Sequence, residues 1–328
     1  MAAAAVLGIA VPAAWVATSI TPGEEAVKVR NSLVARLGTP EDFNWRPDQV
    51  PPEFLSDEGA VPADFRELVA QLASDGAGGT RQGFELGLEF SRYLMSASRR
   101  LGGPIQSNLA DARRQITTEG RGYCADFTQV FTALATAAKL PVRRWSISFV
   151  GFGAGHTFNE VYDAQRRKWT LVDAFHSLYF IDPTSGEPLS VLEVHDRLLA
   201  LDGTSAGIAI RRIVPQRLPF RSEALALDYY RRGMPQLAMA WGSNSFGYDQ
   251  SKAIRTAASI SRHLERAVAI AVDQYPDLVI YPVGVSERDV AELRRTRQQF
   301  VLAAGALIVS LLVFGWQLIM LWSRRLPS

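Results

Sequence analysis

The feature that most restricts the fold of this chain is a long apolar run near its C-terminus. Residues 300–322 read FVLAAGALIVSLLVFGWQLIMLW, with only two clearly polar members. A helix of this length can cross the hydrocarbon core of a bilayer. Arginines stand on both sides of the run, and Trp316 and Trp322 lie in its C-terminal half, where aromatic rings favour a membrane interface. The sequence therefore predicts a transmembrane helix over residues 299–322 rather than a buried core helix.

The N-terminus is apolar as well. It reads MAAAAVLGIAVPAAWVATSI, which is rich in alanine, contains Pro12 and lacks the positively charged start of a secretory signal. We expect residues 1–21 to form a second membrane helix, with a cleaved signal or a buried start as alternatives. Two spans would leave residues 22–298 on one side of the membrane. Because Arg324 and Arg325 in the short tail suit the cytoplasmic side, we expect the soluble part to be periplasmic, on a bacterial inner membrane.

Composition excludes several classes of function. The chain has 328 residues and a formal net charge of +2, so it lacks the broad basic surface of a nucleic-acid-binding protein. Its single cysteine, Cys124, rules out an intramolecular disulfide and a cysteine-rich metal site. Beyond the constellation described below, no spacing of histidines and carboxylates resembles a metal ligand set. We therefore expect no cofactor, no metal and no nucleic-acid partner.

Proline positions and helical patterns divide the soluble part. Residues 22–105 combine recurring prolines with short amphipathic patterns, such as DFRELVAQL, and predict a mostly helical N-terminal extension. Residues 106–200 contain a helix followed by strands and form the expected core domain. Residues 201–298 return to helical patterns, such as DYYRRGMPQLAMAW, and predict a C-terminal helical extension that covers the core or connects it to the membrane.

The single cysteine begins a helical pattern. In RGYCADFTQVFTALATAAKLPVR, apolar residues recur at helical spacing from Ala125 onward, and Gly122 precedes the thiol as a turn residue. Cys124 therefore falls at a helix N-terminus, where unpaired N–H groups and the helix dipole stabilise a thiolate. The same amides can receive an oxyanion. Tyr123 and Asn108 are further candidates for oxyanion or substrate contacts, although we expect Tyr123 to be a packing residue, and Asn108 could begin a helix as a cap.

Extended segments follow the predicted helix. VRRWSISFV alternates like a half-buried strand, and HTFNEVYD, a polar turn and WTLVDAF together predict a β-hairpin. His156 begins one strand and Asp173 lies near the end of its partner, and in an antiparallel hairpin these two ends are neighbours. An aspartate in that place can hold one imidazole nitrogen so that the other faces the thiol of Cys124. The pattern therefore indicates a Cys–His–Asp triad.

Other side chains fit this arrangement less well. Asp182 is the alternative partner of the histidine, but a following proline and a nearby glycine mark a turn there. His176 lies three residues beyond Asp173 and could be a partner or a pocket residue, although we expect it to face solvent. His195 and His263 lie in helical patterns beside charged residues, and we expect both on the surface.

Four ordered pieces of this region resemble the core of the transglutaminase-like superfamily. They are the GYCADF start of the helix, the KLPVR turn, the GHTFNEVY strand and the KWTLVD strand, between Asn108 and about Asp182. The resemblance implies a papain-like α+β core, in which the cysteine helix packs on an antiparallel sheet, here with helical extensions and terminal transmembrane helices. Carried over residue by residue, Cys124, His156 and Asp173 match the catalytic triad of the family.

The resemblance also implies an enzyme. Cys124 would attack an amide carbonyl and form a thioester, and we expect hydrolysis of a peptide or protein, as by a cysteine peptidase or amidase, rather than transfer to an amine. The alternative is a catalytically inactive module that serves binding or assembly in the cell envelope. Phe158 stands where the family commonly has tryptophan, and Ala174 where it has proline, which concerns the substrate wall and a local turn. The expected partners are the substrate, the membrane and envelope proteins.

Overall fold

The computed structural model describes residues 23–98, 100–200, 207–215 and 219–323. The helix expected over residues 1–21 lies outside these described residues. The chain divides into two compact units. The larger comprises residues 34–149 and 155–285, and the smaller comprises residues 1–33, 150–154 and 286–328.

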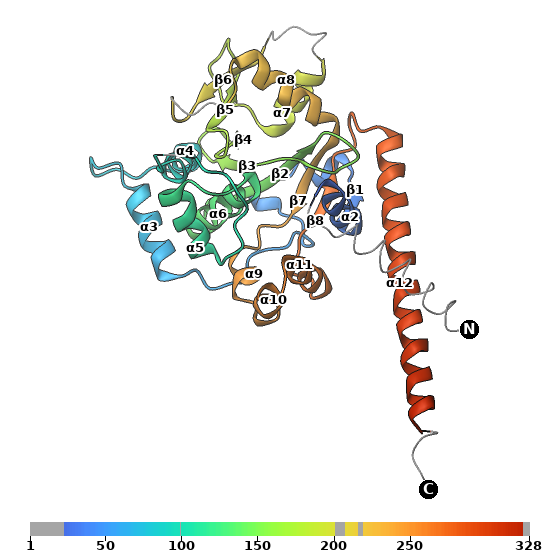
Figure 1. The fold of residues 1–328 in the computed structure, drawn as a ribbon. Coiled ribbons are helices and arrows are strands. Elements are labelled where there is room, and N and C mark those ends of the chain that lie inside the picture. The colour runs from blue at the N-terminus through green and yellow to red at the C-terminus, as the bar shows by residue number, and fades with distance from the viewer. Residues whose placement is uncertain (1–22, 99, 201–206, 216–218, 324–328) are drawn as a thin grey trace. The chain divides into compact units, whose positions relative to one another are not determined.

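A six-stranded sheet organises the larger unit (Figure 1). Its strands are, in spatial order, β1 (Ala35–Leu37), β8 (Asp277–Ile280), β7 (Leu237–Trp241), β2 (Val142–Ser148), β3 (Gly155–Asp163) and β4 (Lys168–Val172). All neighbours pair antiparallel except β1 and β8, which are parallel. The strand predicted from VRRWSISFV is β2, and the predicted hairpin is β3 with β4. The unit is therefore the expected α+β structure.

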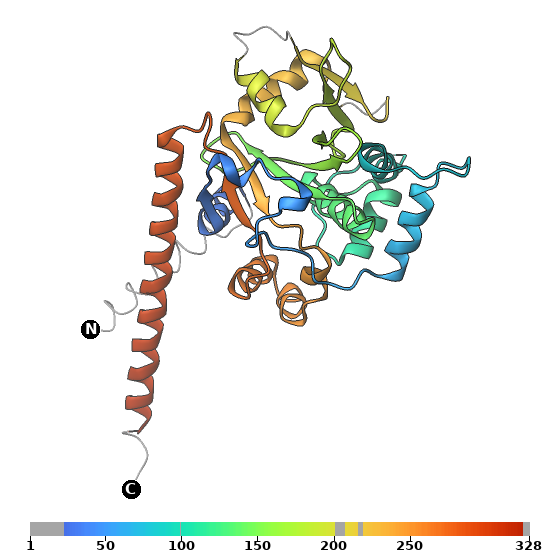
Figure 2. The same cartoon turned by 180° about the vertical axis from the view of Figure 1, so that it is seen from behind.

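Helices cover both faces of the sheet (Figures 1 and 2). One face carries α3 (Ala63–Ala73), α4 (Gly83–Leu94), α5 (Leu109–Arg114) and α6 (Cys124–Ala137). The other carries α7 (Val191–Ala200), α8 (Glu223–Gly233) and a two-stranded sheet of β5 (Leu178–Ile181) and β6 (Ala209–Arg212). Short helices α9 (Phe246–Gln250), α10 (Lys252–Ala258) and α11 (Arg262–Ala271) separate β7 from β8. Each face has its own apolar core.

Strand alternation decides which side chains reach which core. Successive side chains of a strand point to opposite faces. In β3, Val161 packs into the core under α6, whereas Phe158 packs into the core under α8. His156 shares the parity of Phe158, so its side chain belongs to the α8 face. Asn159 pairs with Val172 across the hairpin, and one position later Asp173 falls on the α8 face as well.

A buried ion pair joins β2 to β3. Arg143 donates from Nε and Nη2 to Glu160 Oε2, at 2.9 and 2.6 Å, and both side chains are almost fully buried. The indole N–H of Trp145 donates to the same oxygen, and the backbone N–H of Val191 donates to Oε1. The guanidinium also lies over the ring of Trp169, 4.1 Å from its centroid. Two residues of the KLPVR and GHTFNEVY pieces are thus bonded directly.

The C-terminal part of the larger unit differs from the helical pattern expected for it. Within DYYRRGMPQLAMAW the helix α8 ends at Gly233, and LAMAW forms strand β7. Pro235 explains the break, because proline lacks an N–H donor and clashes with the preceding helical turn. Four of the five side chains in β7 are buried, since the strand lies inside the sheet between β8 and β2. The apparent helical periodicity of this stretch arises from burial on both faces of a strand.

The smaller unit contains α2 (Glu24–Val34), residues 150–154 and the long helix α12 (Glu287–Ser323). Lys28 on α2 lies 3.6 Å from Glu292 on α12, and Asn31 donates to the carbonyl of Phe152. Among the described residues, one helix is long and apolar enough to cross a membrane. This stretch, Glu287–Gln317, has a mean hydropathy of 2.1 over its most apolar window, none of which is buried. It includes most of the predicted C-terminal span.

Candidate functional site

Cys124 is the first residue of α6. The chain reaches it through Gly122, whose φ of 115° is a backbone conformation that side chains with a Cβ rarely adopt. A Cβ at this position would also press on Ile105, Ile116 and Phe127, each 3.3 Å away. This turn places the thiol at the helix N-terminus, as the sequence predicts.

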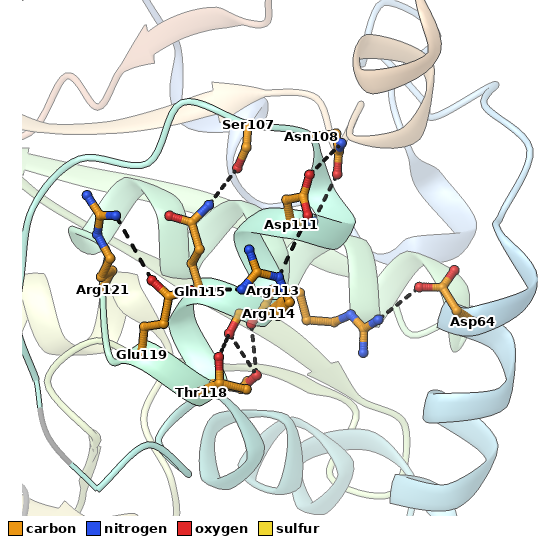
Figure 3. A network of polar contacts seen from close by, with 11 residues as sticks. Asp64, Ser107, Asn108, Asp111, Arg113, Arg114, Gln115, Thr118, Glu119 and Arg121 are labelled. Atoms are coloured by element: carbon orange, nitrogen blue, oxygen red, sulfur yellow. Dashed lines mark hydrogen bonds and ion pairs between the residues drawn. The ribbon is translucent and has the colours of Figure 1, made fainter.

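A polar network holds the segment that leads into this turn (Figure 3). Arg113 on α5 pairs with Asp64 on α3 at 2.9 Å, and Arg114 pairs with Glu119 at 2.8 Å. Asn108 accepts the backbone N–H of Asp111, so the side chain caps α5 and takes the second of the two roles considered for it. The network therefore fixes residues 107–121 against α3, which supports the approach to the cysteine.

Tyr123 and Asp126 complete the start of α6. The carboxylate of Asp126 accepts the backbone N–H of Tyr123 at 2.8 Å, which satisfies a donor at the helix terminus. The ring of Tyr123 is half exposed, with 52% of its surface accessible. It lies at the surface rather than in the core, so the expectation that Tyr123 is a packing residue is wrong.

The structure brings the three predicted triad residues together. His156, the second residue of β3, hydrogen-bonds with Cys124 on one side. Its Nε2 lies 2.5 Å from Asp173 Oδ2 on the other side, and both His156 and Asp173 are almost completely buried. Thr157, the next residue in the strand, also hydrogen-bonds with Cys124, by its backbone and its side chain. A continuous chain of contacts therefore runs from thiol to imidazole to carboxylate.

Two further residues, Tyr230 and His176, contact Asp173. No sequence pattern pointed to Tyr230. Tyr230 on α8 donates its hydroxyl to Asp173 Oδ2. His176 donates its backbone N–H to Asp173 Oδ1 at 2.9 Å, and its Nδ1 lies 2.9 Å from Tyr230 Oη and 3.2 Å from Asp173 Oδ2. The rings of His176 and His156 are stacked, with centroids 4.1 Å apart. The aspartate thus accepts hydrogen bonds at both of its oxygens.

Two expectations about histidines are wrong. His176 does not face solvent but is 7% exposed, because the turn after β4 folds it under α8. His195 is completely buried, with Nε2 3.1 Å from the carbonyl of Val283 and Nδ1 2.9 Å from Asp196. Charged neighbours in the sequence suggested exposure, but α7 turns this residue toward β8 and the chain that follows it. The side chain of His263 lies outside the described part of the structure.

Asp182 takes the role of a turn residue. Its carboxylate accepts the backbone N–H groups of Thr184 and Ser185 and lies 2.9 Å from Arg197. These contacts close the turn after β5 and leave the carboxylate partly exposed. Asp182 is thus the turn residue that the following proline and nearby glycine indicate. The carboxylate that contacts the His156 imidazole is that of Asp173.

The electrostatics of the site favour a charged pair. Burial opposes the charged form of His156, but the adjacent carboxylate of Asp173 outweighs it and raises the pKa of the imidazole to about 10. Burial alone would raise the pKa of the Cys124 thiol, yet the hydrogen bond and the charge of His156, with help from Thr157, hold that pKa below its ordinary value. The two shifts act in the same sense and favour an imidazolium–thiolate pair over the neutral pair.

The neighbouring groups keep to one protonation state. Burial opposes ionisation of Asp173, but the charge of His156 and hydrogen bonds from His156 and His176 hold the pKa of this carboxyl well below its ordinary value. Burial lowers the pKa of His176, and the charge of His156 acts in the same direction, so this second imidazole is neutral. Burial and the nearby carboxylate raise the pKa of Tyr230, which stays a hydroxyl donor.

The same cluster has the spacing of a metal site. Ligand atoms of His156, Asp173 and His176 lie within 4.8 Å of one another. Each of these atoms is already engaged: both imidazoles contact the carboxylate, and His176 also contacts Tyr230. Hydrogen bonding therefore accounts for the closeness of the three side chains.

Comparison with known proteins identifies the core. Residues 85–174 match the family model of the transglutaminase-like superfamily. This range contains α6, the β2–β3–β4 sheet and all three residues of the Cys–His–Asp chain. Neither the curated proteins nor the solved structures contain a match to the chain.

Proposed function

Residues 85–174 of this chain form a transglutaminase-like core, and on this basis we propose that the protein is a cysteine enzyme that cleaves amide bonds through a thioester on Cys124. The observation that carries the proposal is the continuous contact from Cys124 through His156 to Asp173. A thiol in this setting is ionised and oriented, which are the two conditions for nucleophilic attack on a carbonyl.

The steps follow from the geometry. The Cys124 thiolate attacks the amide carbonyl carbon, and the C=O electron pair moves to oxygen. The N–H groups at the start of α6 are placed to stabilise that oxyanion. The C–N bond then breaks while the imidazolium of His156 gives its proton to the leaving amine. In the second half, neutral His156 takes a proton from water as the water oxygen attacks the thioester carbonyl. The C–S bond then breaks, which releases the acid and restores the Cys124 thiolate beside the His156 imidazolium.

We propose water rather than an amine as the acyl acceptor, which makes the chain a peptidase or amidase. A peptide or protein is the proposed substrate class, because Cys124 is only partly buried and the preceding residue, Tyr123, exposes its ring at the surface. Asp173 and His156, by contrast, are shielded from water. Such a site accommodates an extended chain laid across it more readily than a small enclosed ligand.

We further propose that the enzyme works at a membrane. The support is the apolar stretch in α12, whose most apolar window is not covered by protein. With the arginines of the short tail on the cytoplasmic side, the larger unit would lie outside the cytoplasm. A reporter fused after Ser328 tests this orientation: activity of the reporter in the cytoplasm is expected, and activity only outside it would reverse the assignment.

Alkylation of the thiol tests the enzymatic proposal. Since Cys124 is the single cysteine, iodoacetamide labels one site in the full-length chain. We expect a rate–pH profile with a midpoint well below that of a free cysteine, whose pKa is about 8.5. In His156→Ala the midpoint should return toward the free value. The midpoint is the appropriate readout because it reports ionisation independently of intrinsic nucleophilicity.

A control variant and an overturning result complete the test. His195→Gln removes another buried histidine of the same unit, one that contacts Asp196, Val283 and Tyr281 instead. Its alkylation profile should match that of the wild type. A wild-type thiol that titrates like free cysteine, with no effect of His156→Ala, would leave the inactive binding module as the better description of this fold.

A further inference from the structure

The carboxylate that contacts His156 is held by residues outside the family-matched segment. Tyr230 comes from α8, more than fifty residues beyond the match at residues 85–174, and His176 comes from the turn just after it. We propose that Tyr230 and His176 are positioning residues that keep Asp173 ionised and His156 in place, so that the catalytic unit of this chain extends to α8. This inference rests on the proposed function.

The first argument is the solvation of Asp173. The side chain is fully buried, so no bulk water compensates its charge. A buried carboxylate without donors protonates instead. Here Oδ1 accepts the backbone N–H of His176, and Oδ2 accepts His156 Nε2 and the hydroxyl of Tyr230. Tyr230 thus supplies a side-chain donor, in addition to the imidazole itself, that a charged Asp173 can use.

The second argument is the direction of the hydrogen bonds. A tyrosine hydroxyl has one proton, and Tyr230 gives it to Asp173. Its oxygen is then an acceptor for the group 2.9 Å away, which is His176 Nδ1. His176 must therefore carry its proton on Nδ1. This neutral tautomer aligns the tyrosine hydroxyl toward the carboxylate, and the three residues form one ordered chain of donors.

The third argument is the packing of the rings. His176 stacks on His156 at 4.1 Å, with an angle of 23° between the planes. Tyr230 lies edge-on to both imidazoles, with centroids 6.0 Å away. Rotation of the His156 ring would require His176 to move, and His176 is fixed by its bonds to Asp173 and Tyr230. The His156 ring is therefore held by stacking against His176 as well as by the hydrogen bond from its Nε2 to Asp173.

Every charged or titratable group around Asp173 fits this assignment. On the hairpin side there are His156 and His176, and on α8 there are Tyr230 and its neighbour Tyr229, which is uncharged because burial raises its pKa. Cys124 approaches from α6. Arg100, whose guanidinium lies 4.0 Å from the Phe175 ring centroid, adds a positive charge that disfavours a second imidazolium at His176.

The contacts predict a measurable effect on the thiol. Without the Tyr230 hydroxyl, buried Asp173 binds a proton more readily and takes it from His156. The imidazole then becomes neutral, the thiolate loses its counter-charge, and the pKa of Cys124 rises. A hydrogen bond to a charged group corresponds to a shift of about one pH unit in the midpoint of the alkylation profile for Tyr230→Phe.

The experiment compares four variants of the full-length chain by their iodoacetamide rate–pH profiles. Tyr230→Phe should raise the midpoint, and His176→Phe should raise it too, because phenylalanine keeps the stacked ring but cannot orient the tyrosine hydroxyl. His176→Asn should restore a midpoint near that of the wild type, since its amide N–H occupies the place of Nδ1–H. Tyr248→Phe is the matched control, because it removes a partly buried hydroxyl that donates to Glu265 instead.

The outcomes separate this inference from the proposed function. If the wild-type midpoint is low and remains low in both Tyr230→Phe and His176→Phe, the positioning roles are wrong while the cysteine chemistry stands. If the wild-type thiol titrates like free cysteine, the proposed function itself fails. Should Tyr230→Phe not fold, the contrast between His176→Phe and His176→Asn decides alone, and equal midpoints in these two variants overturn the inference.

Discussion

Glu160 accepts three donors on a single oxygen, and the closest is Arg143 Nη2 at 2.6 Å. The two residues lie directly opposite each other on β3 and β2. Their pair is located in the core under α7 rather than at the surface. It bonds β2 to β3, the strand that carries His156, and its integrity is therefore a condition for the site.

The first prediction is that removing the charge of one partner of this ion pair lowers the stability of the fold. Glu160→Gln leaves the Arg143 guanidinium buried with its counter-charge removed, and we expect a loss of about 3–5 kcal/mol in the free energy of unfolding. Denaturant unfolding of the full-length chain in detergent measures it. The exposed pair of Arg231 and Asp228 gives the control, since Asp228→Asn should cost less than about 1 kcal/mol. Similar losses in both variants would contradict the role of burial.

The turn before the cysteine gives a second prediction. Gly122→Ala adds a Cβ at a φ of 115° and against Ile105, Ile116 and Phe127, so we expect a loss of about 1–3 kcal/mol and slower alkylation of Cys124. Gly76→Ala is the control: its φ is 76°, but nothing lies within 4 Å of an added Cβ. The control should be less destabilised and should keep the wild-type alkylation rate. A normal rate in Gly122→Ala would show that the turn does not position the thiol.

The third prediction concerns the close approach of α8 to β2. A Cβ on Gly233 would lie 2.8–3.0 Å from side-chain atoms of Ile147, so Gly233→Ala must displace the end of α8. Overpacking of this kind costs about 1–3 kcal/mol. Because Tyr230 lies one turn earlier on the same helix, we also expect a higher midpoint of the alkylation profile. The double variant Gly233→Ala, Ile147→Val removes the atom in the closest contact, Ile147 Cδ1, and should lower that midpoint part of the way. No recovery at all would argue against a displacement of α8.

The fourth prediction concerns stability against pH. The pKa of His156 is raised in the folded chain to about 10, whereas its value in the unfolded chain is about 6.5. Its stabilising contribution is therefore complete below about pH 6.5 and is lost as the pH rises toward the folded value. To remove the opposing contribution of the thiol, the comparison uses Cys124→Ala with and without His156→Gln. Because Cys124 itself helps to raise the pKa of His156, that pKa is less raised in this background than in the wild type. The difference in unfolding free energy between the two variants should therefore narrow as the pH rises above about 6.5, and a constant difference would contradict the charged state of His156.

The parts of the site that are close in sequence could be predicted from it. Cys124 begins a helix with regular apolar spacing, and His156 and Asp173 lie on adjacent strands joined by a short turn. These relationships are local, and residue periodicity determines them. The family match covers the same segment.

The remaining contacts depend on long-range packing. Tyr230 meets Asp173 across 57 positions of the chain, and nothing in its own helix marks it as part of a site. His176 looked like a loop residue because its burial is created by α8 and not by its own neighbours. Strand β7 read as helix because its side chains are buried on both faces, which removes the alternation by which strands are recognised.

The order of the sheet also has a consequence for how this protein is made. Strand β1, at residues 35–37, lies beside β8, at residues 277–280, and β8, β7 and β2 separate it from the β3–β4 hairpin. A chain that emerges from the ribosome can form the hairpin and α6 early, but its sheet remains incomplete until Ile280 has been synthesised. The next element is α12, with the apolar stretch. Completion of the larger unit and synthesis of the apolar stretch are therefore nearly simultaneous events in biosynthesis, and a truncated chain that ends before β8 would leave the edge of β7 open to association with other chains.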